Sequence, residues 1–339
     1  MPTPSRAVRR SLLTLLALAA TLAPALAVQP AHAAATTYVA LGDSYSSGTG
    51  TRSYIEDGTD CQRSTFAYPS LISAQRGYTL DFRACSGATV ADVANTQLGS
   101  LSSATNFVTI SVGGNDAGFA DVLTECATPW WAGDCDGAID QAQAYINNTL
   151  PGTLSSLYGS IGSLAPSAQV AVVGYPRIFM GEDCNALTWF APEEQARLNQ
   201  MADLLNTRIS AQAGAHGFSF ANPTNAFIGH AFCDNPEWIN GLSNPISESY
   251  HPNRDGQASG YAPTVSPVLT GAGLTVTAAT RRAAAASGDE LAARQRKYAA
   301  LDSTIEPAEF RIPNLHSPQM RKAAREAGIN LDRWLARQQ

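Results

Sequence analysis

The amino-acid sequence predicts an α/β fold of three layers, in which a mainly parallel sheet lies between two layers of helices. Short runs rich in Val, Ile and Leu recur without polar alternation, which is typical of strands buried on both faces. Segments with helical spacing separate these runs, and this alternation favours parallel strands joined by helices. With 339 residues, the chain is long enough for one such domain and an extension.

Five apolar runs are expected to form the strands of this sheet. In chain order they cover residues 38–41, 79–83, 107–112, 170–173 and 218–220. Helices are expected over 138–164, where Pro151 must interrupt the helix, and over 192–209. In the second of these, Pro192-Glu193-Glu194 opens the segment and apolar residues then follow at three-to-four spacing.

The first 33 residues are expected to be a signal peptide. Three arginines precede an apolar run from Leu12 to Leu26, and Ala31-His32-Ala33 has the small-x-small form of a cleavage site. No later run approaches the ~18 apolar residues that a membrane helix needs. We therefore expect a secreted, extracellular monomer without a transmembrane segment.

Residues 271–339 are expected to form a basic, helix-rich C-terminal extension beyond a main domain of residues 36–270. The stretch 279–300 is rich in Ala, Arg and Glu, and Ser287-Gly288 interrupts it. One short amphipathic helix is expected over Met320–Leu335, with a basic face that could meet anionic lipid or the acidic body. The preferred interpretation is a dispensable, partly disordered appendage.

The charge balance argues against nucleic acid as a partner. The chain carries 22 basic and 28 acidic residues, for a net charge of −6. The basic residues gather in the leader and the extension, which leaves the body strongly acidic. Because affinity for nucleic acid is built from Lys and Arg, such a body is not expected to bind it.

The six cysteines indicate disulfides and not a metal site. All of them follow the leader, and none forms the close CxxC couple of a zinc site. Three disulfides suit an oxidising compartment. Six cysteines allow about 15 pairings, of which the sequential one is the simplest.

Three residues with useful chemistry follow three successive predicted strands. Ser44 ends the Gly42-Asp43-Ser44 corner, Gly87 follows the second strand, and Asn115 follows the third in Gly-Gly-Asn-Asp. Ligand sites of open parallel sheets lie beyond the carboxyl ends of the strands. His251, which precedes a proline, can accept the serine proton because a histidine titrates near neutral pH.

These four residues, in this order, resemble the motifs of the GDSL or SGNH hydrolases. That family carries a Ser in Gly-Asp-Ser, a second-block Gly, an Asn in Gly-x-Asn-Asp and a His before Pro. The likeness covers roughly residues 36–270 and is greatest to secreted actinobacterial lipases, esterases and phospholipases A. It implies a flavodoxin-like α/β/α fold and favours the sequential disulfides Cys61–Cys85, Cys126–Cys135 and Cys184–Cys233.

The resemblance also implies roles for the site residues. Ser44 would be the nucleophile, with His251 as general base and then general acid. The Ser44 and Gly87 backbone N–H groups and the Asn115 amide would form the oxyanion hole. No cofactor or metal is implied.

The group that orients His251 has two candidates. Glu248 stands three residues before the histidine, where many family members have a shorter Asp. The backbone carbonyl of Ser249 is the other, and it is narrowly favoured. Either group could accept the imidazole N–H and fix its tautomer.

The expected activity is hydrolysis of carboxylic esters of lipids, acylglycerols or phospholipids, possibly at a lipid–water interface. A carbohydrate acetyl-esterase and an acyltransferase are the alternatives on the same scaffold. An inactive module that binds a surface is the alternative of a different class, and the intact motif residues argue against it. Trp130-Trp131 could wall an acyl groove or touch lipid, or could pack a loop onto the core.

Overall fold

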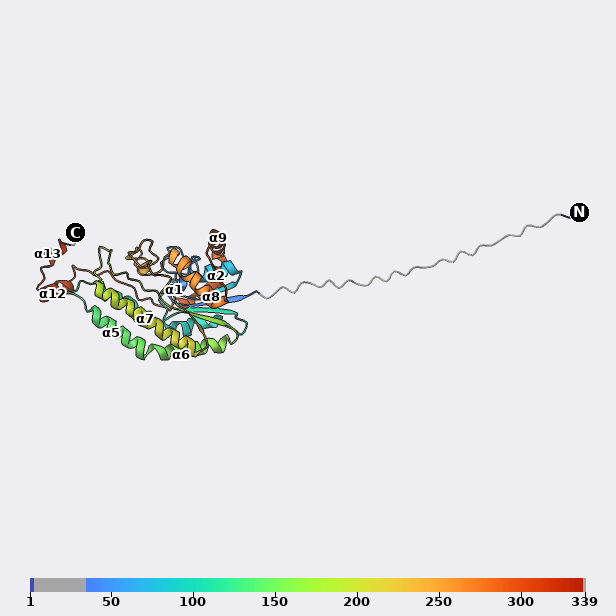
Figure 1. Ribbon diagram of the computed structural model, residues 1–339, viewed down its shortest axis with the longest axis horizontal. Helices are drawn as coiled ribbons and strands as arrows, with labels where there is room; N and C mark the ends of the chain where they lie inside the picture. Colours follow the sequence, from blue (N-terminus) through green and yellow to red (C-terminus); the bar gives the residue numbers. More distant parts are fainter. Residues whose placement is uncertain (3–34, 338–339) are drawn as a thin grey trace. The chain divides into compact units, whose positions relative to one another are not determined.

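The computed structural model describes residues 1–2 and 35–337 of the chain (Figure 1). The predicted signal peptide falls outside the main described range, which begins at Ala35. From Ala35 onward the chain forms one compact unit. Within the described residues, none of the helices has the length and apolar character needed to cross a membrane.

A five-stranded parallel sheet forms the centre of the molecule, with the strand order β2-β1-β3-β4-β5. This architecture confirms the predicted fold class, and each strand overlaps a predicted run. The strands are β1 (Thr37–Gly42), β2 (Thr79–Phe82), β3 (Phe107–Ser111), β4 (Gln169–Val173) and β5 (Ser219–Ala221).

The strand β1 is buried on both faces, as its unbroken apolar sequence predicts. Tyr38, Ala40 and Leu41 are fully buried. Ala40 pairs with Phe82 of β2 on one side, and Leu41 pairs with Ile110 of β3 on the other. Because β1 runs between these two neighbours, it is an internal strand of the sheet. The site lies beyond the carboxyl ends of the strands, and the carboxyl end of β1 is one of the ends it adjoins.

Helices cover both faces of the sheet. Figure 1 shows α5, α6 and α7 along one face, and α2 and α8 on the other. As predicted, the helical region around Pro151 is divided, since α5 ends at Asn148 and α6 begins at Leu150. The helices of this part are α1 (Ser44–Ser47), α2 (Tyr68–Arg76), α3 (Val90–Asp92), α4 (Phe119–Cys126), α5 (Cys135–Asn148), α6 (Leu150–Leu164), α7 (Pro192–Ala215) and α8 (Ala262–Thr270).

Three disulfides join the cysteines in sequential pairs. They are Cys61–Cys85, Cys126–Cys135 and Cys184–Cys233. The first pair links the loop before α2 to the segment that follows β2. That segment leads directly to Gly87, so this disulfide constrains the backbone beside the site.

The C-terminal extension, which the sequence predicted to be partly disordered, contains several helices that pack on the main domain. Its helices are α9 (Ala278–Ala286), α10 (Gly288–Gln295), α11 (Ala299–Asp302), α12 (Pro318–Glu326) and α13 (Leu331–Leu335). Of these, α9 packs on α2, and α10 packs on β2. Asp302 forms buried ion pairs with Arg63 at 2.5 Å and with Arg83 at 2.7 Å. The extension is therefore held by buried charge pairs, which its Ala-rich sequence does not reveal.

The single helix expected over Met320–Leu335 is in fact two helices. Gly328 has a φ of 70°, a backbone conformation that ends a helix and favours glycine. The apolar residues of α12 and α13 pack with Trp131, whose ring centroid lies 5.5 Å from that of Trp334. Trp131 is thus a packing residue, whereas Trp130 is 72% exposed.

Candidate active site

Ser44 lies at the corner where β1 gives way to α1. Gly42, two residues earlier, has a φ of 118°, and a Cβ atom there would lie 2.2 Å from the Ser111 carbonyl oxygen. Only glycine fits this close approach between β1 and β3. The chain then turns sharply, and Ser44 becomes the first residue of the helix, where it lines a cavity beyond the sheet.

Asp43 holds this corner through its buried carboxylate. It accepts hydrogen bonds from the Tyr45 N–H at 3.1 Å and from the Ser111 hydroxyl at 2.7 Å. The Tyr175 hydroxyl donates a third at 2.5 Å. Burial raises the pKa of Asp43 to about 6, although the hydrogen bond from Tyr175 opposes this rise. These contacts give Asp43 a structural role, in which it stabilises the corner.

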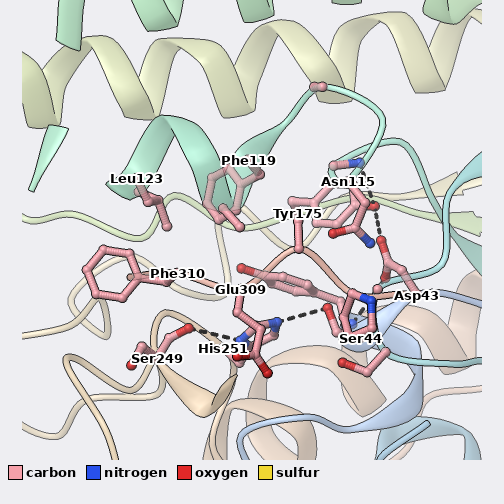
Figure 2. A pocket seen from close by; sticks show the side chains of 18 of the residues that line it. Asp43, Ser44, Asn115, Phe119, Leu123, Tyr175, Ser249, His251, Glu309 and Phe310 are labelled. Atoms are coloured by element: carbon pink, nitrogen blue, oxygen red, sulfur yellow. Dashed lines mark hydrogen bonds between the residues drawn. The ribbon is translucent and has the colours of Figure 1, made fainter. Parts of the chain in front are cut away.

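His251 lies against the serine hydroxyl (Figure 2). Its Nε2 atom is 2.9 Å from the Ser44 Oγ atom, and its Nδ1 atom is 2.9 Å from the Ser249 carbonyl oxygen. A carbonyl can only accept, so Nδ1 carries the proton and Nε2 is left to accept from the serine. Burial lowers the pKa of His251 to about 4, against the effect of its bond to Ser249. The imidazole is therefore neutral at neutral pH, as a general base must be.

The loop that carries His251 is tied to the corner of Ser44. Tyr250 has a φ of 61°, a rare conformation for a bulky residue and one that clusters at functional sites. Its carbonyl accepts a hydrogen bond from the Tyr45 hydroxyl at 2.9 Å. Asn240 pairs with both Tyr250 and His251, because its backbone N–H donates to the His251 carbonyl and its backbone carbonyl accepts from the Tyr250 N–H.

Of the two candidates for orienting His251, the Ser249 carbonyl is the group that contacts it. The Glu248 carboxylate is buried but points elsewhere. It accepts a hydrogen bond from the Tyr54 hydroxyl at 2.5 Å, and it lies 3.4 Å from the Arg52 Nε atom. Glu248 thus holds the loop around residues 52–54, and the geometry favours the carbonyl.

We expect Glu248→Gln to keep most of the activity. The glutamine can still accept from Tyr54, and the carbonyl that holds His251 belongs to the backbone of Ser249. The measurement is kcat/KM for p-nitrophenyl butyrate, with Ser249→Ala as a matched control that also leaves the carbonyl in place. A loss of several orders of magnitude in Glu248→Gln alone would contradict this assignment.

Gly87 and Asn115 line the same cavity as Ser44 and His251. Gly87 has a φ of 83°, in the left-handed region that favours glycine. The Asn115 Nδ2 atom donates to the Ala88 carbonyl at 3.0 Å, which fixes the plane of the amide. In the described part of the chain this amide nitrogen has no second hydrogen-bond acceptor, so its other N–H can serve a ligand.

Asp116, next to Asn115, holds the turn. Its carboxylate accepts a hydrogen bond from the Val90 N–H at 3.0 Å, at the start of α3. Burial raises the pKa of Asp116 to about 6. This contact links the segments that carry Gly87 and Asn115, and it gives Asp116 a positioning role.

The cavity beside these residues has a volume of about 240 Å³. Apolar side chains from α4, α5 and α7 form much of its wall, and Figure 2 shows Phe119, Leu123 and Phe310 around it. The lining residues with large aliphatic side chains or phenyl rings are Phe119, Leu123, Ile146, Ile178, Leu198, Met201, Leu205, Ile246 and Phe310. The shape and lining fit a pocket for an aliphatic chain.

Two parts of the site were missed by the sequence analysis. Tyr175 bonds to Asp43, and its place just beyond the end of β4 could have identified it. Residues 307–310 of the extension line the cavity as well. No motif or periodicity in that Pro-containing stretch signals such a role.

Comparison with known proteins assigns the family. Residues 40–258 match the GDSL-like Lipase/Acylhydrolase family. Lipase 1 of Streptomyces coelicolor is 47% identical over 253 residues, which cover 74% of this chain and 91% of that protein. Two crystal structures cover 69% of this chain and 100% of their own. They are an extracellular lipase of Streptomyces rimosus, with 42% identity and a TM-score of 0.65, and phospholipase A1 of Streptomyces albidoflavus, with 43% identity and a TM-score of 0.66. The chain therefore belongs to the GDSL-like lipase/acylhydrolase family.

Proposed function

We propose that the protein is a secreted serine esterase that hydrolyses carboxylic esters of lipids. The observation that carries this proposal is the 2.9 Å contact between the Ser44 hydroxyl and the Nε2 atom of a neutral, partly buried His251, beside an apolar cavity. A serine becomes an effective nucleophile when an adjacent base can take its proton. The family membership of the chain supports the same reaction class.

In the first half-reaction, Ser44 attacks the ester carbonyl while His251 takes the hydroxyl proton at Nε2. The Ser249 carbonyl accepts from Nδ1–H, so it stabilises the imidazolium that forms. His251 then gives the proton to the alcohol that leaves, and the acyl group stays on Ser44. In the second half-reaction, His251 activates a water that releases the acid.

The oxyanion of each tetrahedral intermediate needs donors that are already in place. Ser44, Gly87 and Asn115 line the same cavity, and the proposed donors are the backbone N–H groups of the first two and the side-chain amide of the third. Removing one such donor typically lowers the rate by about 100- to 1,000-fold. The bond from Asn115 to the Ala88 carbonyl pre-orients the amide for this role.

The apolar wall of the cavity supports lipid acyl chains over acetyl groups as substrates. A short acyl group would leave most of this wall without contact, whereas a longer chain buries it. Secretion is supported by the arginine-led apolar leader and by the three disulfides, which suit an oxidising compartment.

The test is hydrolysis of p-nitrophenyl esters from acetate to palmitate by the purified protein. Each added methylene that enters the cavity contributes about 0.8 kcal/mol. We therefore expect kcat/KM to rise at least about tenfold from acetate to the medium-chain esters.

A variant in the cavity wall separates chain binding from general reactivity. Phe119→Ala should reduce the preference for medium chains, since its ring lines the cavity. Leu164→Ala, at an exposed position, is the matched control and should leave the profile unchanged. If acetate proved the best substrate, the carbohydrate acetyl-esterase alternative would replace the lipid assignment.

A further inference from the structure

A segment of the C-terminal extension crosses the mouth of the active site. This segment, residues 305–310, is called the strap below. Asp302 anchors its start through the buried pairs with Arg63 and Arg83. Beyond its C-terminal end, Leu315 is buried in the apolar cluster that contains Trp131 and Trp334. The family match ends at residue 258, so the strap belongs to a part of the chain outside it.

The strap contacts the site at two points, one beside Gly87 and one beside the loop that carries His251. A Cβ atom on Gly87 would lie 2.5 Å from Pro307, so the proline packs directly against the glycine of the proposed oxyanion hole. Phe310 is 5% exposed, lines the cavity, and has its ring centroid 5.1 Å from that of Tyr250. Residues 307–310 of the strap and Ser44 line one cavity, so a substrate bound there lies beside the strap.

Between these two contacts, the strap presents a carboxylate to the entrance. Figure 2 shows Glu309 among the side chains that line the cavity with Ser44 and His251, and Glu309 is exposed. Asp60, also exposed, lines the same cavity. Within the described residues, neither carboxylate belongs to any of the ion pairs of the protein.

The lining of the cavity offers nothing to balance these charges. Among the described residues that line it, none is lysine or arginine. The nearby Arg311 pairs with Asp121 at 2.9 Å, outside the lining. Asp43 also lines the cavity, but it is buried and already accepts three hydrogen bonds. Among the described residues that line the cavity, the exposed charged ones, Asp60 and Glu309, are thus both acidic.

We propose that Glu309 of the strap, together with Asp60, selects neutral acyl esters and disfavours esters that carry a phosphate. This inference rests on the proposed function and names its substrate class as acylglycerols. In a phospholipid, the phosphate is separated from the scissile ester only by the glycerol backbone. With the ester carbonyl at Ser44, a phosphate this close would lie near the exposed lining residues, of which Glu309 and Asp60 are the charged ones among those described.

The size of the effect follows from the exposure of both carboxylates. Each like-charge contact through water across several ångströms changes the rate by about threefold, and added salt screens it. Selection by charge at an exposed entrance is therefore moderate. It changes the ratio of the kcat/KM values for two substrates that share one acyl chain.

The experiment compares monodecanoylglycerol with decanoyl lysophosphatidic acid, which differ only by the phosphate. The readout is kcat/KM for each ester at low salt, with the full-length protein. We expect the native protein to prefer the neutral ester. Glu309→Gln and Asp60→Asn should each raise kcat/KM for the phosphate ester by about threefold, and together by about tenfold, with less than about twofold change on the neutral ester. Glu306 is an exposed strap residue outside the cavity lining, so Glu306→Gln is the matched control and should leave kcat/KM unchanged for both esters.

Each outcome decides between the claims. A native preference for the phosphate ester, or equal changes on both esters in Glu309→Gln, would overturn the selection by charge while leaving the esterase assignment intact. Hydrolysis of neither ester would overturn the proposed function, and this inference with it. Loss of the Glu309→Gln effect at high salt is expected, because exposed charges are screened.

Discussion

Replacing Ser44 with alanine is expected to lower kcat for p-nitrophenyl butyrate by about five orders of magnitude. The substitution removes the oxygen that would attack the carbonyl and form the acyl-enzyme. His251, 2.9 Å away, would then have no proton to accept from the protein. The residual rate would reflect only binding and the oxyanion donors. Steady-state kinetics on the purified variant measure this loss directly.

A neighbouring serine gives the matched control for this prediction. Ser47 lies on the same helix and is also buried, but its hydroxyl bonds to the Ser44 carbonyl and to Thr49 instead of to His251, so Ser47→Ala is the control variant. We expect it to keep most of its activity. Circular dichroism and thermal melts of both variants show whether each is folded. A Ser44→Ala variant that is folded and still active would contradict the assignment of the nucleophile.

Replacing Asp302 with asparagine is expected to lower the free energy of unfolding by about 3–5 kcal/mol. The Asp302 carboxylate bonds to Arg63 at 2.5 Å and to Arg83 at 2.7 Å, and all three side chains are fully buried. Without it, Asp57, 2.6 Å from Arg63, would be the one carboxylate left among the described residues that pairs with either of the two buried guanidinium groups. An uncompensated buried charge is far more destabilising than a missing surface pair.

Urea unfolding, followed by circular dichroism and tryptophan fluorescence, measures this change. Asp289→Asn is the matched control, because it replaces an exposed acid at the start of α10 in the same extension. The control is expected to stay within about 0.5 kcal/mol of the native protein. An Asp302→Asn variant as stable as this control would contradict the anchoring of the extension by these ion pairs.

The sheet and the order of the site residues could be predicted from the sequence because they depend on local signals. Each strand is a short apolar run, and Ser44, Gly87 and Asn115 follow directly after three of them. The histidine carries its own motif before Pro252. The residue types that favour these turns and these buried strands lie within a few positions of each element.

The parts that sequence reasoning did not predict depend on contacts between distant segments. The pairs from Asp302 to Arg63 and Arg83 join positions 239 and 219 residues apart, and a lone charged residue carries no sign of its partner. The strap has neither a helical nor a strand period, so its place over Gly87 could not be inferred. The choice between Glu248 and the Ser249 carbonyl also needed the structure, since it depends on where one side chain points.

The measurement that tests the central claim most directly is the mass of the protein during turnover. Protein quenched in acid after mixing with a p-nitrophenyl ester, and then analysed as intact protein and as peptides, should carry one acyl group on the peptide that contains Ser44. The Ser44→Ala variant should carry none. An acyl group on another residue, or turnover with no acyl group on the native protein under conditions that trap such intermediates, would contradict a serine esterase built on Ser44 and His251.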